Sequence, residues 1–198
     1  MKKSWLLSLM MSFALLGGAV LPTGASVSAA SDTTPVYYDE NSAVTEDTAG
    51  EDTSADEPEF TADEADLLDY IDQLEAAAVY EERAFNSFKG GMTITSANRK
   101  SIFLKLNNTA IPNYTKYVSK LKLIKPKNAE LQKIHAKLVK GSYTQLEAYQ
   151  LFKQSVSKTK VNSTQLKQGN DKLAAGAKLI EQSNQEFIKY ANKLGFDL

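Results

Sequence analysis

His135, the only histidine in the chain, is the first residue to consider for acid–base or metal chemistry. It stands between Leu131 and Leu138 at the spacing of one helix face, so we expect it on an apolar face. Ferritin-like di-iron sites use a Glu-x-x-His pattern, but Gln132 stands where that pattern needs a glutamate. The chain contains no cysteine, which excludes a thiolate metal site. We therefore predict no metal or cofactor site, and a hydrogen-bonded histidine in the core or at its edge.

A second group of titratable residues, Asp69, Asp72 and Glu75, recurs every three residues and therefore shares one helix face. Two carboxyl groups can perform acid–base chemistry when burial raises the pKa of one of them. Ile71 and Leu74 mark the apolar side of the same segment, so these acids are expected to face solvent. No nucleophile elbow, phosphate-binding loop, HExxH zinc motif or EF-hand loop occurs. We predict that the protein is not an enzyme; the alternative left open is a metal-binding or hydrolytic protein that uses His135.

Charge is divided unevenly along the chain. Residues 31–88 contain 18 acidic residues and one basic residue, whereas residues 89–198 contain 20 basic and six acidic residues. Arg99 is the single arginine of the second part, so bidentate recognition of nucleic acid is not expected. Eight lysines surround a turn expected near residues 125–128 and are candidates for binding a polyanion. They are Lys116, Lys120, Lys122, Lys125, Lys127, Lys133, Lys137 and Lys140.

Several partners fit such a lysine group. An anionic wall polymer, an anionic lipid surface or an acidic protein would each complement it. Alternatively, the lysines are simply a solvated surface. A further alternative is a protein–protein interaction module in which the acidic residues regulate the basic face.

The first 30 residues have the pattern of a cleavable secretory signal peptide. Lys2 and Lys3 precede an apolar run over residues 5–20, and small residues follow Pro22 and Gly24. The apolar run is shorter than the ~20 residues that span a bilayer. We expect a secreted protein with no transmembrane segment after cleavage. Association with the cell wall is compatible with this expectation.

The next segment has a composition typical of disorder. Residues 31–66 contain 13 acidic residues and neither lysine nor arginine. A high net charge with few apolar residues buries too little surface to offset chain entropy. We therefore expect residues 31–60 to be a disordered acidic linker.

Residues 61–198 are predicted to form the folded domain. Thr61 and Glu64 make a capping-box pattern at the start of a first helix, which is expected to end at residues 90–91. A second helix is expected over residues 96–121, with a kink at Pro112, and a third over residues 128–156. A fourth is expected from Asn162 to Gly195. Short connections between long helices favour an all-α fold, an antiparallel up-down four-helix bundle.

Gly169 and Gly176 are seven residues apart and lie on one stripe of the fourth helix. They predict close packing of a bulky neighbour such as Phe85 or Tyr149, with a dimer interface as the alternative.

The segment around the expected turn, together with part of the fourth helix, resembles a known type of domain. The matching residues are Ile124, Lys125, Pro126, Asn128, Leu131, Ile134, His135, Gly141, Asn170, Leu173 and Gly176. They are similar to those of a helical domain in uncharacterised secreted proteins and lipoproteins of Bacillus-like, Gram-positive bacteria, over about residues 65–198. The resemblance implies an extracytoplasmic four-helix domain of the cell envelope without assigned catalytic residues. This chain departs from the lipoprotein members because it has no cysteine to accept a lipid.

Overall fold

The computed structural model describes residues 60–88 and 91–196. These residues form four helices and no strand, which confirms the all-α class. The predicted signal peptide and all but the last residue of the predicted acidic linker lie outside the described residues. Within the described ranges, no helix has the length and apolarity needed to cross a membrane.

Helix α2 (Ala62–Asn86) begins with the predicted capping box. The backbone N–H of Thr61 donates to the Glu64 carboxylate at 2.8 Å, and the Glu64 N–H donates to Thr61 Oγ1 at 3.3 Å. The sequence spacing predicts Phe85 and Phe88 on the apolar stripe of this segment. Phe88 is buried as expected, but Phe85 is 39% exposed, so the prediction is wrong at Phe85. The buried positions in the second half of the helix are Ala77, Glu81 and Ala84, which continue the spacing of the first half.

The second helix is one continuous run of three parts, α3 (Arg99–Lys105), the π-helical segment η2 (Leu106–Ala110) and α4 (Ile111–Leu123). The expected break at Pro112 takes the form of this π segment. The Ile111 N–H donates to the carbonyl of Leu106, five residues back, so the widened turn accommodates the missing proline N–H. The helix was expected to begin at residue 96, but it begins at Arg99, and the residue before it is Asn98.

The last two helices begin and end close to their predicted limits. Helix α5 (Ala129–Val156) is capped by Asn128, whose side chain accepts from the N–H groups of Glu130 and Leu131. Helix α6 (Ser163–Lys193) is capped by Asn162 in the same way. Gly195 follows α6 with φ of 82°, the left-handed conformation that favours glycine. Local capping chemistry therefore predicts these limits well.

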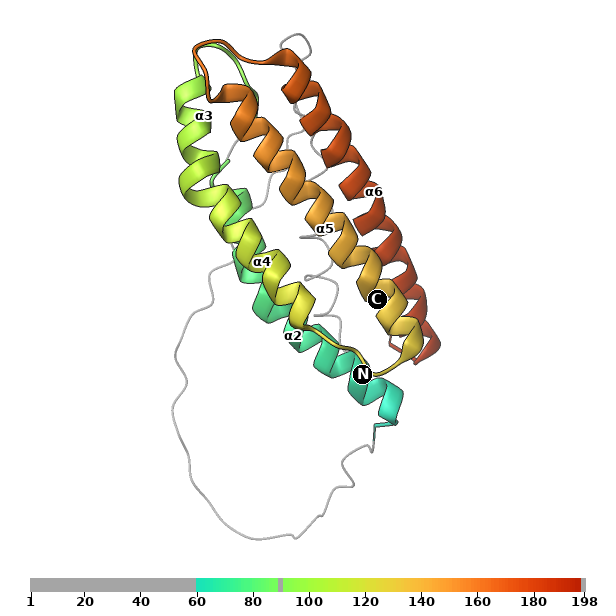
Figure 1. The fold of residues 1–198 in the computed structure, drawn as a ribbon. Coiled ribbons are helices and arrows are strands. Elements are labelled where there is room, and N and C mark those ends of the chain that lie inside the picture. The colour runs from blue at the N-terminus through green and yellow to red at the C-terminus, as the bar shows by residue number, and fades with distance from the viewer. Residues whose placement is uncertain (1–59, 89–90, 197–198) are drawn as a thin grey trace, which may run out of the picture. The chain divides into compact units, whose positions relative to one another are not determined.

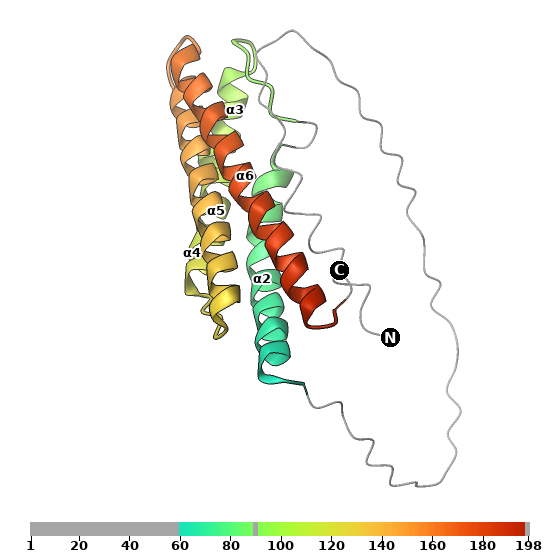
Figure 2. The same ribbon diagram turned by 90° about the vertical axis from the view of Figure 1, so that its right-hand side faces the viewer.

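Two helix pairs make the most extensive contacts. Helices α5 and α6 lie side by side along their length, and α2 lies against α4, as Figures 1 and 2 show. Helix α4 also packs against α5. The core contains side chains from all of these helices, including the fully buried Tyr70, Tyr114, Tyr149 and Phe152.

Glycines allow α5 and α6 to approach closely. A Cβ atom on Gly176 would lie 2.8 Å from the carbonyl oxygen of Gly141, and one on Gly169 would lie 2.5 Å from the Phe152 ring. The expected close packing of a bulky side chain is found at Gly169, but the side chain is not Phe85 or Tyr149. Phe152 and the backbone of α5 take their place, because α6 packs mainly on α5.

We predict that Gly176→Ala destabilises the protein by about 1–3 kcal/mol, because the new methyl group meets backbone that must shift. The free energy of unfolding, measured by urea titration, tests this. Gln168→Ala, at an exposed position of the same helix, is the control and should change stability by less than ~0.5 kcal/mol. Alanine is the better helix former, so a more stable Gly176→Ala variant would contradict the close approach.

Candidate anion-binding site

The turn between α4 and α5 is held in place by the first turns of α2. The Asp66 carboxylate accepts from the Lys127 N–H at 2.9 and 3.0 Å and from the Asn128 N–H at 2.8 Å. Asp63 accepts from the Asn128 side chain at 2.9 Å. Asp66 is only 6% exposed, so these backbone donors replace the water that its charge would otherwise bind. In the sequence, Asp66 is the last of the 13 acidic residues of residues 31–66, and nothing in that pattern predicts its hydrogen bonds to the turn.

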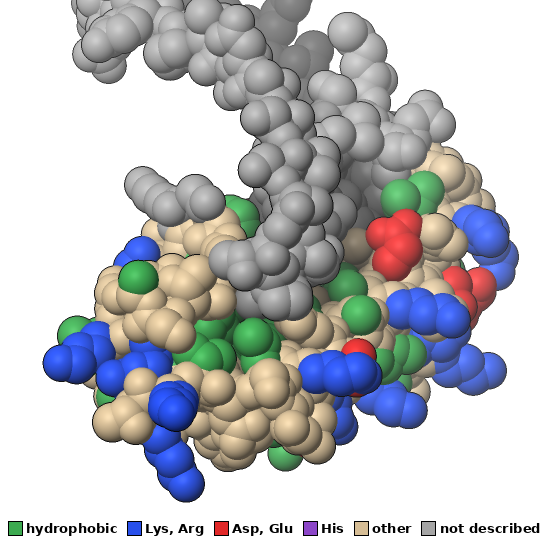
Figure 3. Space-filling view, turned by 90° about the horizontal axis from the view of Figure 1, so that it is seen from above, with side chains coloured by type: hydrophobic (Ala, Val, Ile, Leu, Met, Phe, Trp, Pro, Cys, Tyr) green, Lys and Arg blue, Asp and Glu red, His purple; other side chains and the backbone are tan. Residues whose placement is uncertain are grey.

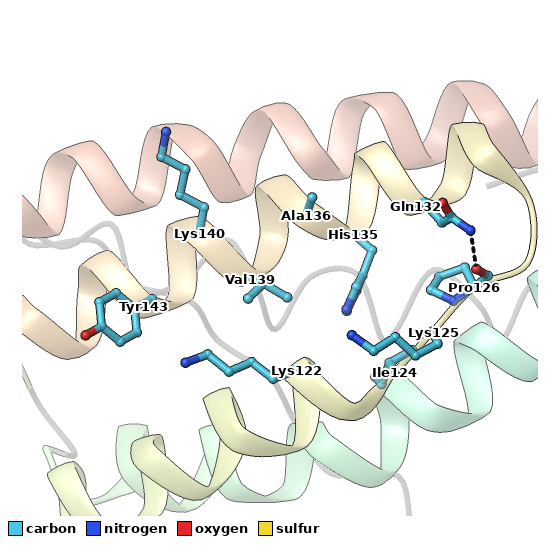
Figure 4. Close-up of a pocket in the computed structure, with 10 residues that line it drawn as sticks. All are labelled: Lys122, Ile124, Lys125, Pro126, Gln132, His135, Ala136, Val139, Lys140 and Tyr143. Carbon is cyan, nitrogen blue, oxygen red and sulfur yellow. Dashed lines mark hydrogen bonds between the residues drawn. The ribbon is translucent and has the colours of Figure 1, made fainter.

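Beside this turn lies a hollow of about 690 Å³, which we call the α4–α5 groove (Figure 4). It is lined by Lys122, Ile124, Lys125, Pro126, Gln132, His135, Ala136, Val139, Lys140 and Tyr143. Lys122 and Lys125 extend along the gap between α4 and α5, whereas Lys140 points away from α4. Gln132 donates to the Pro126 carbonyl at 2.9 Å, which ties the turn to α5.

The groove is electropositive. The Lys122 ammonium lies 4.9 Å from the centre of the Tyr143 ring, a cation–π distance. Within the described residues, the four ion pairs involve other lysines, so no described carboxylate neutralises Lys122, Lys125 or Lys140. No acidic residue lines the groove. An anion in the groove would be attracted by its lysines and would meet no carboxylate among the lining residues.

The other candidate lysines occupy different places. Lys116 and Lys120 line a smaller hollow of about 200 Å³ with Tyr80, and the Lys116 ammonium is 5.8 Å from the centre of the Tyr80 ring. The eight lysines are therefore not one site.

Of the remaining three, Lys137 forms an ion pair with Glu186, while Lys127 and Lys133 are exposed near the turn. Figure 3 shows lysine and arginine side chains on another face of the molecule as well. Positive charge is thus spread beyond the α4–α5 turn, and the groove is the larger of the two lysine-lined hollows described above.

His135 forms one wall of the groove, and both of its ring nitrogens are engaged. Nε2 donates to the carbonyl of Leu121 at 2.9 Å, so a neutral ring must accept at Nδ1 from the Tyr70 hydroxyl at 3.1 Å. Burial lowers the pKa of His135, which favours this neutral form. The expected hydrogen-bonded core histidine is confirmed.

The predicted carboxylate face of α2 lies mostly in solvent. Asp69 and Asp72 are exposed, as expected, and Glu75 is half-buried. In the described part of the chain, no three His, Cys, Asp or Glu side chains come together as a metal site would require.

Glu81 is a buried acid on helix α2. It is 3% exposed, and neither carboxyl oxygen has a hydrogen-bond partner among the described residues. Tyr114, Tyr117 and Tyr149 lie near enough that an ionised Glu81 would raise the pKa of each hydroxyl. Burial raises the pKa of Glu81 to about 8, so it is mostly protonated at neutral pH. The signal in the sequence was its position, seven residues after Leu74 on the buried stripe.

We predict that removing Asp66 destabilises the turn. Asp66→Ala leaves the partly buried backbone N–H groups of Lys127 and Asn128 without their charged acceptor and should cost about 2–3 kcal/mol of unfolding free energy. Asp72→Ala, an exposed acid on the same helix, is the matched control. Equal stability of the two variants in urea unfolding would show that the Asp66 bonds are not needed.

We predict that Glu81 makes stability fall as the pH rises. Its folded pKa of about 8 lies above the ordinary 4.5, so the folded state holds a proton that the unfolded chain releases between these values. From pH 5 to pH 8, the wild type should lose about 3 kcal/mol relative to Glu81→Gln.

Urea unfolding of both proteins at several pH values measures this difference. The opposite contribution of His135, which is lost as the pH falls below about 6.5, is present in both proteins and cancels. The exposed neighbour Glu82→Gln is the control. Parallel stability curves for wild type and Glu81→Gln would contradict the buried protonated acid.

Comparison with protein-family models, with curated proteins and with solved structures gives no match to this chain. The candidate roles above therefore rest on the geometry of the described residues.

Proposed function

We propose that this is an exported, non-enzymatic protein of a Gram-positive cell envelope that binds anionic wall polymer or anionic lipid headgroups at the α4–α5 groove. Its helices, in this proposal, form an antiparallel up-down four-helix bundle. The observation that carries the binding role is that Lys122 and Lys125 extend along a concave surface with no described carboxylate to neutralise them. The wall or membrane location rests on the predicted signal peptide and on the resemblance to extracytoplasmic domains.

Lysine suits a ligand whose anionic group has no fixed orientation. An ammonium group is a compact charge with three rotatable donors, whereas bidentate recognition would need arginine. The groove is open to solvent, so its interactions are screened and should weaken as salt increases. Phosphate or carboxylate groups of an envelope polymer or headgroup fit these requirements.

The two alternative functions gain no specific support. Regulation by the acidic linker concerns residues outside the described part of the chain. Metal or hydrolytic chemistry at His135 would have to break the hydrogen bond to Leu121 or the one to Tyr70.

The test is binding of the processed chain, residues 31–198, to vesicles containing phosphatidylglycerol and to linear polyphosphate, measured against salt. Each lysine near an anionic surface contributes about 1 kcal/mol, so Lys122→Gln with Lys125→Gln should weaken binding about 30-fold at low salt. The matched control is Lys158→Gln with Lys160→Gln, which makes the same charge change in the exposed α5–α6 connection.

A much smaller loss in the control than in the groove variant supports the groove. Equal losses would show that binding follows total charge and not the groove. The proposal would be refuted if the wild-type protein bound neither the vesicles nor polyphosphate at low ionic strength.

A further inference from the structure

We infer that the α4–α5 groove binds a single-chain amphipathic anion, with its acidic head between Lys122 and Lys125 and its hydrocarbon chain against the apolar wall. This deepens the proposed function and rests on it, because it specifies which anionic component occupies the site.

The first reason is the chemistry of the groove surface. Beside its lysines, the groove is lined by Ile124, Pro126, Ala136 and Val139. A polymer of phosphate groups has no apolar part to cover this surface. A ligand with a hydrocarbon chain would remove it from water, and burial of apolar area is the main favourable term in such binding.

The second reason is size and shape. A volume of about 690 Å³ lies within the range of roughly 300–1,000 Å³ typical of sites for single small molecules. A flat bilayer surface meets protruding side chains and does not fill a hollow between two helices. The groove therefore suits one lipid-like molecule taken out of a membrane or micelle.

The third reason is the arrangement of the charged side chains. The Lys122 ammonium faces the half-exposed Tyr143 ring, which holds this charge within the groove by a cation–π contact. His135 is neutral with both nitrogens occupied, so it adds wall area without selecting a head group. The head is thus held by charge alone, and carboxylate, sulfate and phosphate heads should bind similarly.

Selectivity should come from the chain. Each additional buried methylene should tighten binding about fourfold until the groove is filled. Decyl phosphate should therefore bind more tightly than octyl phosphate, and decanoate about as well as decyl phosphate.

The experiment is calorimetric titration of the processed chain, residues 31–198, with three probes, the two decyl probes being kept below their micelle concentrations. Decyl phosphate carries charge and chain, glycerol phosphate carries charge alone, and decyl maltoside carries the chain alone. The expected result is saturable one-to-one binding of decyl phosphate, at least tenfold tighter than either other probe. Decyl phosphate binding no tighter than that of glycerol phosphate would overturn the inference.

Two variants separate this inference from the proposed function. Ala136→Trp fills the groove from an exposed position without changing charge, so it should weaken decyl phosphate at least tenfold and leave polyphosphate unchanged. Gln150→Trp, at an exposed position further along α5, is its control, and circular dichroism checks that both fold. Lys122→Gln with Lys125→Gln should weaken both ligands.

The outcomes are distinct. If polyphosphate binds and depends on the two lysines, but decyl phosphate gains nothing from its chain, the inference fails and the proposed function stands. If neither ligand binds, both fail. If decyl phosphate binds equally well to wild type and to Ala136→Trp, it occupies another surface, and the inference is again overturned.

Discussion

The candidate site depends on the hydrogen bonds that the Asp66 carboxylate accepts. This carboxylate accepts from two successive backbone N–H groups of the α4–α5 turn, and so joins the start of α2 to the start of α5. A buried carboxylate is stable only when such donors surround it. The same bonds fix where the turn places Lys125 and Pro126, and therefore fix one side of the α4–α5 groove.

The other side of the groove belongs to α5, which is held from behind by α6. The backbones meet at Gly141 and Gly176, where no side chain would fit without a shift. This contact leaves a different face of α5 for α4 and the groove. Helix α5 thus has one face committed to packing and another where Val139 and Tyr143 are only half-buried or exposed. A rigid wall with uncovered apolar area is suited to binding.

The core contains polar groups as well as apolar ones. The Tyr114 hydroxyl donates to the Gln145 side-chain oxygen at 2.5 Å. Glu81 lies near Tyr114, and its carboxyl group has no hydrogen bond within the described residues. Burying Glu81 lowers stability at neutral pH, since its proton must be retained against the preference of the unfolded chain. Buried polar groups favour the one arrangement of helix faces that provides their partners, and they lower stability where a partner is missing.

The sequence by itself determined the all-α class, the capping of α2, α5 and α6, and the internal position of His135. Caps and helical periodicity act within a few residues, so they can be seen along the chain. The tertiary structure decided that Lys122 and Lys125 share a groove while Lys116 lies on another surface. It also decided that Asp66 and Glu81 are buried whereas Phe85 is exposed. These outcomes depend on the rotation of each helix about its axis and on contacts between residues about 60 positions apart, such as Asp66 and Lys127, which no local pattern encodes.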